Sequence, residues 1–484
     1  MNLALSLLYA AERNPGAEAV VQGDVRFTYT ELLARAACVA RGLAERGLGR
    51  DDRLAAVVRC RHESVQLYWA CQWLGATFVP LSHRVSEADV AYCRDDSGAK
   101  LLLPVDVELD GLRGEAHPGA PDLDEHEESL MLYTSGTTGR PKGVPRSHRA
   151  DRAAGLSQVV QHGYRYGDRT LGCMPLYHTM GIRILLSSLF LGGTCVLQQK
   201  WSPDEALQLI ESHRISALFL VPTMYHDLLS WPDLSERAVR SVASLGFAGM
   251  VLREEIVSRL DSLFPGLVMV NVYGSSELYC LSYSDRVRVK PGTVGPGAFH
   301  QELRVIPESA DRGEDALTEV EVIGQIVARA DAPDAFEGYW NAPAATALAR
   351  RDGWYFTGDL GYRDRDGDLF VVGRADDTIV TGGENVHPVE VESALSHCPG
   401  VAEVCVVGLS DERLGHTVSA FIVRSDPALT EERVFDYCAT AGGLSSFKRP
   451  RRIVFVDEIP KSSVGKVRRH LLREAYSQTR AQSC

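Results

Sequence analysis

The chain has 484 residues, of which 45% are hydrophobic and 24% are charged, and its formal net charge is −13. This length exceeds what one hydrophobic core normally organises, so we expect at least two domains. The acidic balance argues against nucleic-acid binding, because no stripe of Lys and Arg offsets the repulsion of a phosphate backbone.

The first fifteen residues, MNLALSLLYAAERNP, predict an amphipathic helix that ends before Pro15. A signal peptide would begin with basic residues and end in a small-residue cleavage site, and neither is present. The longest apolar stretch, residues 184–197, is interrupted by serines and glycines and is shorter than the ~20 residues of a membrane-spanning helix. The eleven cysteines are scattered without a CxxC pair, which is typical of reduced thiols. We therefore expect a cytoplasmic protein with no membrane association.

Helical and strand patterns alternate through the first two thirds of the chain. Residues 28–48 have the apolar spacing of a helix, and residues 53–59 form a short apolar strand. The same alternation recurs at residues 64–81 and 203–222. This pattern predicts an α/β fold in which helices flank parallel sheets.

The pattern changes in the last third of the chain. From about Thr293, short strands and turns predict a small β-rich subdomain. After Gly373, a helix at residues 389–397, strands at 401–409 and 417–423 and a terminal helix predict a separate α+β unit. We therefore expect a large N-terminal domain over residues 1–375 and a C-terminal domain over residues 376–484.

A glycine-rich loop follows the apolar strand SLMLY at residues 129–133. Its sequence, TSGTTGRPKGV, offers backbone N–H groups, hydroxyls and the ammonium of Lys142 to an anion. The loop lacks the G-x-x-x-x-G-K-[ST] spacing of a Walker A motif. Lysine occurs only seven times in this arginine-rich chain, so Lys142 and Lys466, both beside glycines, are the first candidates for a catalytic cation.

The loop resembles the phosphate-binding signature of the acyl-adenylate-forming superfamily, which includes acyl-CoA synthetases, firefly-type luciferases and peptide-synthetase adenylation domains. Further motifs of that family follow in order over essentially the whole chain. They are PLYHTMG (175–181), YGSSE (273–277), YFTGDLG (355–361), GRADDTIVTGGENVHPVEVE (373–392) and PKSSVGK (460–466). The chain is most similar to short bacterial aryl-CoA ligases of the chlorobenzoate type, through MPLYHTMG, FAGM, GGENVHPVEVE and FKRPRR.

The resemblance implies a role for each motif. The glycine-rich loop would hold the β- and γ-phosphates of ATP, Glu277 and Thr138 would ligate Mg²⁺, and Asp359 would accept the ribose hydroxyls with Arg374 close by. Lys466 would contact both the carboxylate and the α-phosphate, which lowers the barrier to bringing two anions together. The residues implied in nucleotide and CoA binding are Thr134, Ser135, Gly136, Thr137, Thr138, Gly139, Lys142, Gly249, Tyr273, Gly274, Ser275, Ser276, Asp359, Arg374, Gly383, Phe447 and Arg449.

A mobile C-terminal domain would then expose the adenylate to a thiol. Asp376 matches the family's hinge position, and Gly382 and Gly383 match the loop that lines the pantetheine tunnel. One departure concerns Leu414, which stands where chlorobenzoate-type ligases carry a tryptophan that stacks on the CoA adenine. Phe447 and Arg449 still match the segment that binds the CoA nucleotide.

The acyl pocket is the third expected feature. His178 matches the family's aromatic gate beside the reacting carboxylate, and we count it with Lys466 and Glu277 as catalytic. Arg183 interrupts the apolar helix GIRILL, where it pairs structurally or, less often, binds a polar substituent of the substrate. Other residues that plausibly wall the pocket are Thr179, Met180, Phe219, Met250, Ser275 and Leu278.

The sequence thus predicts an ATP- and Mg²⁺-dependent ligase that activates a carboxylic acid, which we expect to be aromatic, and passes it to CoA. We expect it to work as a monomer or homodimer. Three alternatives use the same AMP-forming chemistry with a carrier-protein pantetheine, an amine, or nitrite. A binding module without catalysis, or a luciferase-like oxygenase, is less consistent with intact Lys466, Glu277 and Asp359.

Overall fold

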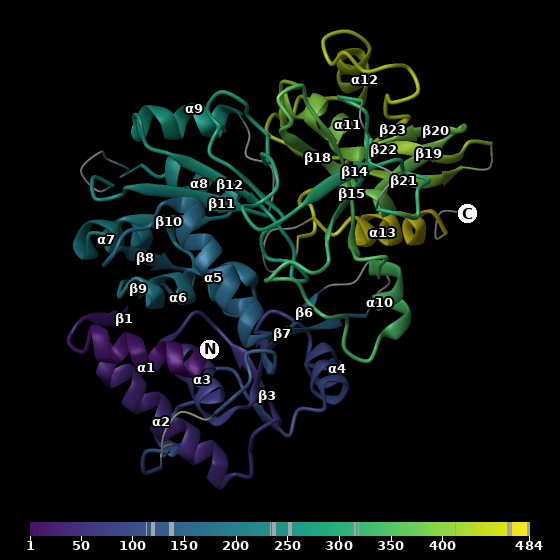
Figure 1. Cartoon of the computed structure of the whole chain (residues 1–484). Coiled ribbons are helices and arrows are strands. Elements are labelled where there is room, and N and C mark those ends of the chain that lie inside the picture. The colour runs from purple at the N-terminus through teal and green to yellow at the C-terminus, as the bar shows by residue number, and fades with distance from the viewer. Residues whose placement is uncertain are drawn as a thin grey trace. The chain divides into compact units, whose positions relative to one another are not determined.

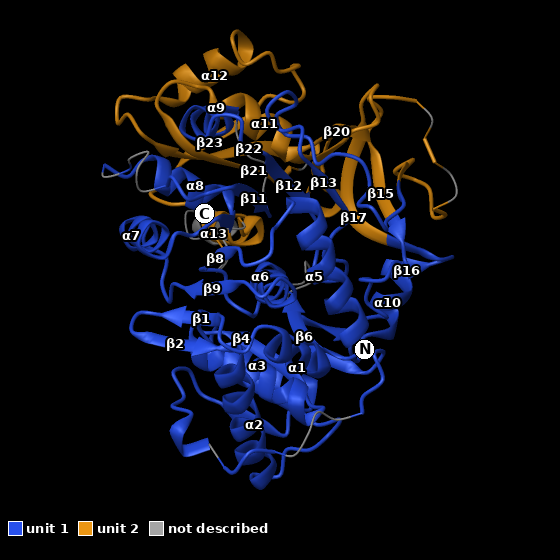
Figure 2. Cartoon of the chain, turned by 60° about the vertical axis from the view of Figure 1, so that its left-hand side comes forward, with its two compact units in different colours: residues 1–303, 328–355 blue, residues 304–327, 356–484 orange. Residues whose placement is uncertain are grey.

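Figure 1 shows the computed structural model of the chain. It describes residues 1–481 except 113, 118–121, 135–139, 233, 235–238, 250–253, 314–315, 318, 412 and 462–466. The chain forms two compact units, coloured separately in Figure 2. Unit 1 contains Met1–Leu303 and Ala328–Tyr355, and unit 2 contains Arg304–Val327 and Phe356–Cys484.

Unit 1 contains an eight-stranded sheet in which the central strands run parallel. Only the outer pairs β1–β2 and β12–β13 are antiparallel. In order across the sheet the strands are β13 (Ser282–Ser284), β12 (Met269–Tyr273), β11 (Ser244–Ala248), β10 (Ala217–Leu220), β8 (Arg169–Gly172), β9 (Thr194–Leu197), β1 (Glu18–Gln22) and β2 (Val25–Thr28). Every residue of β9, β10 and β11 is buried, as expected for parallel strands covered on both faces.

A second sheet of unit 1 has five strands, and its last pair, β6–β7, is antiparallel. In order they are β5 (Leu101–Leu103), β3 (Arg53–Val58), β4 (Thr77–Ser82), β6 (Glu128–Thr134) and β7 (Lys142–Ser147). The helices of unit 1 are α1 (Leu3–Arg13), α2 (Tyr29–Glu45), α3 (His62–Leu74), α4 (Glu87–Ser97), α5 (His148–His162), α6 (Thr179–Phe190), α7 (Pro203–His213), α8 (Pro222–Leu229), α9 (Glu254–Leu263) and α10 (Pro343–Ala349), with the 3-10 turn η1 (Asp110–Leu112). Helix α5 packs against α6 and contacts strands of both sheets, and Figure 2 shows the two helices side by side.

Local capping explains where the helices begin and end. Thr28 accepts a hydrogen bond from the backbone of Glu31, whose carboxylate accepts from the backbone of Thr28, and this capping box starts α2. The Ser147 hydroxyl caps α5 by accepting a hydrogen bond from the backbone N–H of Ala150. Gly163 ends that helix in a left-handed conformation with φ 61°. The helix predicted at residues 28–48 is therefore confirmed with slightly shorter ends, Tyr29–Glu45.

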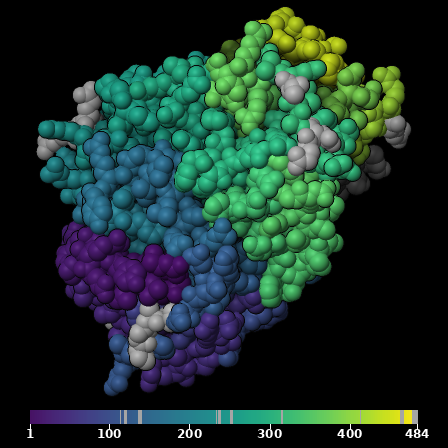
Figure 3. Space-filling view, viewed as in Figure 1, coloured from purple at the N-terminus to yellow at the C-terminus, as the bar shows by residue number. Residues whose placement is uncertain are grey.

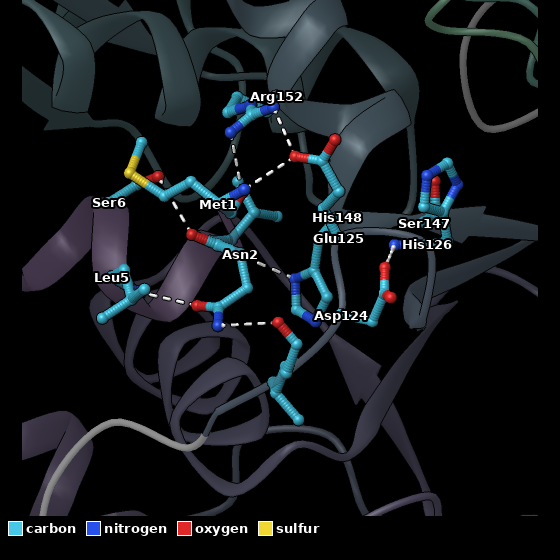
Figure 4. A network of polar contacts seen from close by, with 12 residues as sticks. Met1, Asn2, Leu5, Ser6, Asp124, Glu125, His126, Ser147, His148 and Arg152 are labelled. Carbon is cyan, nitrogen blue, oxygen red and sulfur yellow. Dashed lines mark hydrogen bonds and ion pairs between the residues drawn. The ribbon is translucent and has the colours of Figure 1, made fainter.

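A polar network ties the start of the chain to α5 (Figure 4). The amino group of Met1 lies 2.6 Å from the carboxylate of Glu125, which also pairs with Arg152 at 2.7 Å. The backbone N–H of Leu3 donates to Nδ1 of His148 at 3.3 Å. Burial lowers the pKa of His148 to about 4, so the ring stays neutral and can accept this bond. The predicted N-terminal helix is confirmed as α1, and its outer side reaches the surface among the purple residues of Figure 3.

Unit 2 is built mainly from β-structure. One five-stranded sheet has the order β14 (Leu303–Ile306), β15 (Gly324–Arg329), β17 (Trp354–Arg363) and β16 (Arg350–Arg351), with β18 (Leu369–Arg374) paired to β17. Not all of this sheet belongs to unit 2, because the division between the units falls within β14, β15 and β17, and β16 belongs to unit 1. This sheet is the β-rich segment that the sequence predicts after Thr293.

The C-terminal part of unit 2 is a second five-stranded sheet with helices on both faces. Its strands are β20 (Glu384–Val386), β19 (Ile379–Thr381), β22 (Gly415–Arg424) and β21 (Val401–Asp411), with β23 (Arg452–Phe455) on β22. Its helices are α11 (Pro388–Ser396), α12 (Glu431–Ala439) and α13 (Arg469–Ala481), and the turn η2 covers Ala375–Asp377. Successive residues of β21 face opposite sides, so Val406 packs with Leu395 of α11 whereas Cys405 packs with Leu472 of α13.

The predicted fold class is confirmed: the protein is α/β, with a large N-terminal domain and a smaller C-terminal domain. The domain boundary expected between residues 375 and 376 stays a prediction, because compactness does not identify the segment about which a domain turns. No helix within the described residues is long and apolar enough to cross a membrane. The ten described cysteines are unpaired, and nine of them are buried.

Candidate active site

The glycine-rich loop closes the hairpin between β6 and β7. Thr134, the last residue of β6, pairs with Lys142, the first residue of β7. The predicted phosphate-binding residues Ser135, Gly136, Thr137, Thr138 and Gly139 lie outside the described residues. Gly143, which the sequence suggests as part of the loop's backbone cradle, has a packing role, because a Cβ there would lie 3.1 Å from the Cβ of Trp340 and 3.0 Å from the sulfur of Met131.

Three neighbouring parallel strands of the eight-stranded sheet, β10, β11 and β12, end side by side at one edge, and further predicted residues follow them. Their carboxyl ends are neighbours, as the register pairs Leu220 with Phe247 and Ala248 with Val272 show. Gly249 directly follows β11 with φ 91°, and Tyr273 is the last residue of β12. In open α/β sheets, ligands bind at the carboxyl ends of parallel strands, so this edge is the expected position for a nucleotide.

The segment after Tyr273 makes a tight turn. The backbone N–H of Ser275 donates to the carbonyl of Leu278 at 2.9 Å, and the Ser275 hydroxyl accepts from the N–H of Leu278 at 3.2 Å. Gly274 has to be glycine here, because a Cβ would lie 2.1 Å from the carbonyl oxygen of Tyr279. Ser276 completes the turn and is half-buried. The turn delivers Glu277 as a buried carboxylate, 8% exposed.

Glu277 is fixed on several sides. Its backbone carbonyl accepts from Nη1 of the buried Arg146 at 3.3 Å and from the N–H of Phe336 at 2.8 Å. The hydroxyl of Tyr339 donates to its Oε1 at 2.7 Å. The ammonium of Lys142 lies 4.9 Å from the centroid of the same Tyr339 ring. Tyr339 therefore links the lysine of the glycine-rich loop to the carboxylate of the YGSSE motif.

The residues present fit a magnesium ion. Glu277 is a buried carboxylate, and none of the described residues donates to its Oε2, which is the kind of oxygen that Mg²⁺ prefers. An oxygen-rich site beside a lysine also suits the phosphates that usually accompany this ion. Thr138, the other predicted ligand, lies outside the described residues.

His178 precedes helix α6 as its N-cap residue. Its ring packs edge-on against Tyr177, with centroids 4.5 Å apart. The turn into the helix is close: a Cβ on Gly181 would lie 2.3 Å from the carbonyl oxygen of Pro175. Helix α6 follows β8, whose neighbour in the sheet is β10, so His178 belongs to the same edge as Tyr273. Met250, a predicted pocket wall, lies outside the described residues.

In unit 2, Asp359 and Arg374 lie opposite each other on the antiparallel strands β17 and β18. The Arg374 Nη1 donates to Oδ1 of Asp359 at 2.9 Å and to the carbonyl of Thr357 at 2.8 Å. Gly358 between them has φ 73°, and a Cβ there would lie 2.6 Å from Nη2 of Arg374. The two residues expected at the ribose are thus neighbours in the structure, and their contact with ribose stays a prediction.

The proposed thiol tunnel loop also lies in unit 2. Gly382 and Gly383 form the exposed turn between β19 and β20, with φ values of 60° and 90°. The N–H of Gly382 donates to the carbonyl of Leu414 at 2.9 Å, and the Leu414 side chain would lie 3.3 Å from a Cβ on Gly382. Leu414 is therefore a direct neighbour of the double glycine, which the sequence does not reveal. Asp376 is exposed within η2.

Phe447 and Arg449 lie in the connection between α12 and β23. Phe447 packs against the α11 side of the C-terminal core, and Arg449 donates through Nε to the carbonyl of Leu444 at 2.9 Å. Lys448 between them pairs with Glu390 at 2.5 Å. Lys466 lies outside the described residues, but its loop closes at an antiparallel bridge between Lys461 and Val467.

Sequence motifs did not indicate three residues of this site. The hydroxyl of Tyr339 donates to Glu277. The hydroxyls of Tyr355 and Ser275 lie 3.3 Å apart. Arg146 is fully buried and donates to the backbone carbonyl of Glu277. Tyr355 opens the YFTGDLG motif, which was the available signal for it. Arg146 and Tyr339 carried no such signal, since each contacts Glu277 from more than 60 residues away in the chain.

Comparison with known proteins agrees with this arrangement. Residues 7–340 match the family described as AMP-binding enzyme, and residues 390–466 match the AMP-binding enzyme C-terminal domain. A 4-chlorobenzoate–CoA ligase of Arthrobacter sp. is 34% identical over 98% of this chain and 95% of its own length. A 3-hydroxybenzoate–CoA ligase of Aromatoleum sp. (strain CIB) is 31% identical over 94% of this chain and 93% of its own. The ATP-bound structure of MatB from Rhodopseudomonas palustris superposes with a TM-score of 0.88 at 30% identity, covering 98% of this chain and 99% of that one.

The chain belongs to the AMP-binding enzyme family.

Proposed function

We propose that this enzyme uses ATP to convert a carboxylic acid into an acyl-adenylate, with release of pyrophosphate, and then transfers the acyl group to the thiol of CoA. The observation that supports this most is the link from Lys142 through Tyr339 to Glu277, beside the carboxyl ends of the parallel strands. A cation, a hydroxyl and a carboxylate grouped in this way suit the phosphates of a nucleotide and the metal ion that accompanies them.

The first half-reaction joins two anions. A carboxylate oxygen of the acid attacks the α-phosphorus of ATP, the bond to the pyrophosphate oxygen breaks, and a mixed anhydride of acid and AMP remains. Mg²⁺, which Glu277 and Thr138 would hold, would supply positive charge to the phosphates. Lys142 stabilises charge on the leaving phosphates, and Lys466 contacts the carboxylate and the α-phosphate together. His178 lies beside the carboxylate and orients it.

The second half-reaction requires a thiol to reach the anhydride carbonyl. The thiol loses its proton, its sulfur bonds to the carbonyl carbon, and AMP leaves. The exposed double glycine Gly382–Gly383 is the part of unit 2 that lets a narrow pantetheine arm pass, because no side chain projects from it. Asp376 is the hinge about which the C-terminal domain, residues 376–484, turns between the two half-reactions.

The acid is aromatic in this proposal. The support comes from the two relatives named above, whose names specify a chlorobenzoate and a hydroxybenzoate. The acceptor is CoA for the same reason. A carrier protein would present the same pantetheine arm, so the two acceptors differ only at the nucleotide end of CoA.

A panel of acids tests the proposal. Purified enzyme with ATP and Mg²⁺ is mixed with benzoates, cinnamates and straight-chain acids, and pyrophosphate release is followed with and without CoA. We expect release with at least one aromatic acid and formation of its CoA thioester only when CoA is present. Absence of acid-dependent pyrophosphate release with every acid contradicts the activation step. Release without any thioester contradicts the acceptor, and pantetheinylated carrier protein, amines and nitrite are then tested in its place.

A further inference from the structure

Helix α6 carries a buried arginine that has no acidic partner among the residues that the structure describes. Arg183 is 2% exposed, and within the part of the chain that the structure describes no carboxylate lies within 4.0 Å of its guanidinium. Burying a charge without a counter-charge is costly, so proteins normally pair such a group or use it to bind a ligand. The other large buried arginine, Arg146, follows the rule, because it pairs with Asp151 at 3.1 Å.

The neutral partners of Arg183 leave one edge of its guanidinium, formed by Nε and Nη2, with only one long hydrogen bond among the described residues. Its Nη1 donates to the carbonyl of Tyr279 at 3.3 Å, and its Nη2 reaches Oε1 of Gln161 only at 3.5 Å. The Nε is buried and donates to none of the described residues. Nε and Nη2 point in the same direction and form the edge that binds both oxygens of a carboxylate.

Three titratable side chains close to Arg183, those of His162, Tyr279 and Cys280, are uncharged at neutral pH. Burial, with the nearby Arg183 charge, lowers the pKa of His162 to about 3. Burial raises the pKa of the Cys280 thiol to about 11 and also raises the pKa of Tyr279. The carboxylate of Asp334 already accepts from His300 at 3.0 Å and from the N–H of Cys280 at 3.2 Å. None of the described residues therefore places an anion against this guanidinium.

The position of Arg183 connects it with the acyl site. It lies in the helix that begins next to His178, and its guanidinium carbon is 5.3 Å from the ring centroid of Phe219. Its carbonyl partner, Tyr279, directly follows Leu278 in the turn that presents Glu277. Phe219 and Leu278 are both expected walls of the acyl pocket, so the charge lies where the distant end of a bound acid would reach.

We propose that Arg183 binds a second carboxylate on the acid that this enzyme activates, and so selects dicarboxylic acids over monocarboxylic acids of the same skeleton. The inference rests on the proposed function, because it assigns the residues around Arg183 to the acyl site. The reacting carboxylate lies at His178, and the second carboxylate takes the Nε–Nη2 edge of Arg183. Gln161, whose Oε1 also accepts from the thiol of Cys280 at 3.1 Å, yields its weak contact when the acid binds.

Matched acids test the proposal. Terephthalate is compared with its monomethyl ester and with benzoate, and adipate with hexanoate, in pyrophosphate release by the wild type, Arg183→Met and Arg183→Lys. We expect the wild type to prefer each diacid in kcat/KM. Arg183→Met lowers the ratio of diacid to monoacid by about tenfold to a hundredfold, as loss of a charged hydrogen-bonded pair commonly does. Arg183→Lys keeps the positive charge but lacks the two parallel N–H donors of the guanidinium. We therefore expect a ratio of diacid to monoacid between those of the wild type and Arg183→Met.

Arg169→Met is the matched control, because Arg169 is an arginine of the same unit that already pairs with Glu18 at 3.0 Å. It should leave the ratio unchanged, and thermal unfolding of every variant checks that it is folded. A wild type that prefers the monoacids, or an Arg183→Met variant with the wild-type ratio, overturns the proposal.

Calorimetric binding of terephthalate to the wild type and to Arg183→Met, without ATP, separates this proposal from the proposed function. If no acid releases pyrophosphate but terephthalate binds and depends on Arg183, the adenylation proposal fails and the subsite stands. If monoacids release pyrophosphate and terephthalate does not bind, the subsite fails and the adenylation proposal stands.

Discussion

The guanidinium of Arg469, in the first turn of α13, donates from Nη2 to both carboxylate oxygens of Glu392 in α11, at 2.7 and 2.8 Å. Asp377 forms ion pairs with Arg473 at 3.0 Å and with Arg469 at 3.5 Å. It directly follows the expected hinge residue Asp376. Glu392 also accepts from the N–H of Val406 at 2.8 Å. The helix that follows the Lys466 loop is thereby fastened to α11, to β21 and to the segment beside the hinge.

Substituting Glu392 tests this connection. Glu392→Gln removes the charge that compensates the largely buried Arg469, so we expect the free energy of unfolding to fall by about 2 kcal/mol. The control Glu390→Gln affects only the more exposed pair with Lys448 and should cost less than about 1 kcal/mol. Urea unfolding measures both. Equal losses in the two variants would show that the Arg469–Glu392 pair contributes no more than an ordinary surface pair.

Tyr339 is expected to position the metal ligand. Tyr339→Phe removes the hydroxyl that donates to Glu277 Oε1 and keeps the ring beside Lys142. Loss of such an orienting bond typically costs 10–100-fold, so we expect pyrophosphate release to slow by about tenfold and to need more Mg²⁺ for its half-maximal rate. Tyr362→Phe is the control, because the ring of Tyr362 stacks on Phe370 and its variant likewise loses only a hydroxyl. An unchanged Mg²⁺ requirement would show that the hydroxyl does not act through Glu277.

Lys466→Ala should separate the two half-reactions. We expect adenylate formation to fall by about 10²–10³, the usual cost of removing one charged contact in a transition state. Thioester formation from a supplied acyl-adenylate should continue near the wild-type rate. Lys461→Ala removes the pair with Glu403 at the base of the same loop and serves as the control. If Lys466→Ala slows both half-reactions equally, the lysine acts through the structure of the loop.

Leu414 offers a test of the acceptor. An aromatic side chain stacked on a base is worth about 1–3 kcal/mol, so Leu414→Trp should lower the KM for CoA about tenfold without changing the rate of adenylation. The backbone of Leu414 accepts from Gly382, so the new ring would start beside the double glycine. Leu414→Ala is the control for altered packing. An unchanged KM for CoA in Leu414→Trp would place the CoA adenine elsewhere.

Acid should destabilise unit 1 through His148. Burial lowers the pKa of His148 to about 4 in the folded protein, whereas an unfolded histidine titrates near 6.5. Between these values only the unfolded state binds the proton, so folding stability falls as the pH falls, by about 1.4 kcal/mol per pH unit. His148→Asn keeps an acceptor for the N–H of Leu3 but does not titrate. It should therefore remove about 1.4 kcal/mol per pH unit from the slope of unfolding free energy against pH. Urea unfolding between pH 7 and pH 4 measures it, and identical slopes would contradict the assignment.

Local features were predictable because they depend on neighbours in the chain. The helix at Tyr29–Glu45 begins where Thr28 and Glu31 can form a capping box three residues apart. The strand before the glycine-rich loop ends at Thr134, next to a glycine-rich segment, as expected because glycine is depleted in strands. The ordered motifs likewise identified the family, since each motif is a short continuous segment.

Side-chain partners were not predictable because they come from distant segments. Tyr339 and Glu277 are 62 residues apart, and Arg469 and Glu392 are 77 residues apart. Neither pair follows a local spacing, and each is made only when separate strands and helices pack together.

The sequence by itself determined the alternation of helices and strands, the glycine-rich hairpin and the family, because hydrophobic periodicity and short motifs need no tertiary contact to be recognised. Only the tertiary structure decided that Arg183 is buried without an acidic side chain beside it among the described residues. It also decided that Tyr339 lies between Lys142 and Glu277 and that Leu414 adjoins the double glycine. Burial and pairing depend on which surfaces meet in the folded chain. The sequence around a charged residue therefore does not indicate whether that residue contacts water, a carboxylate or a substrate.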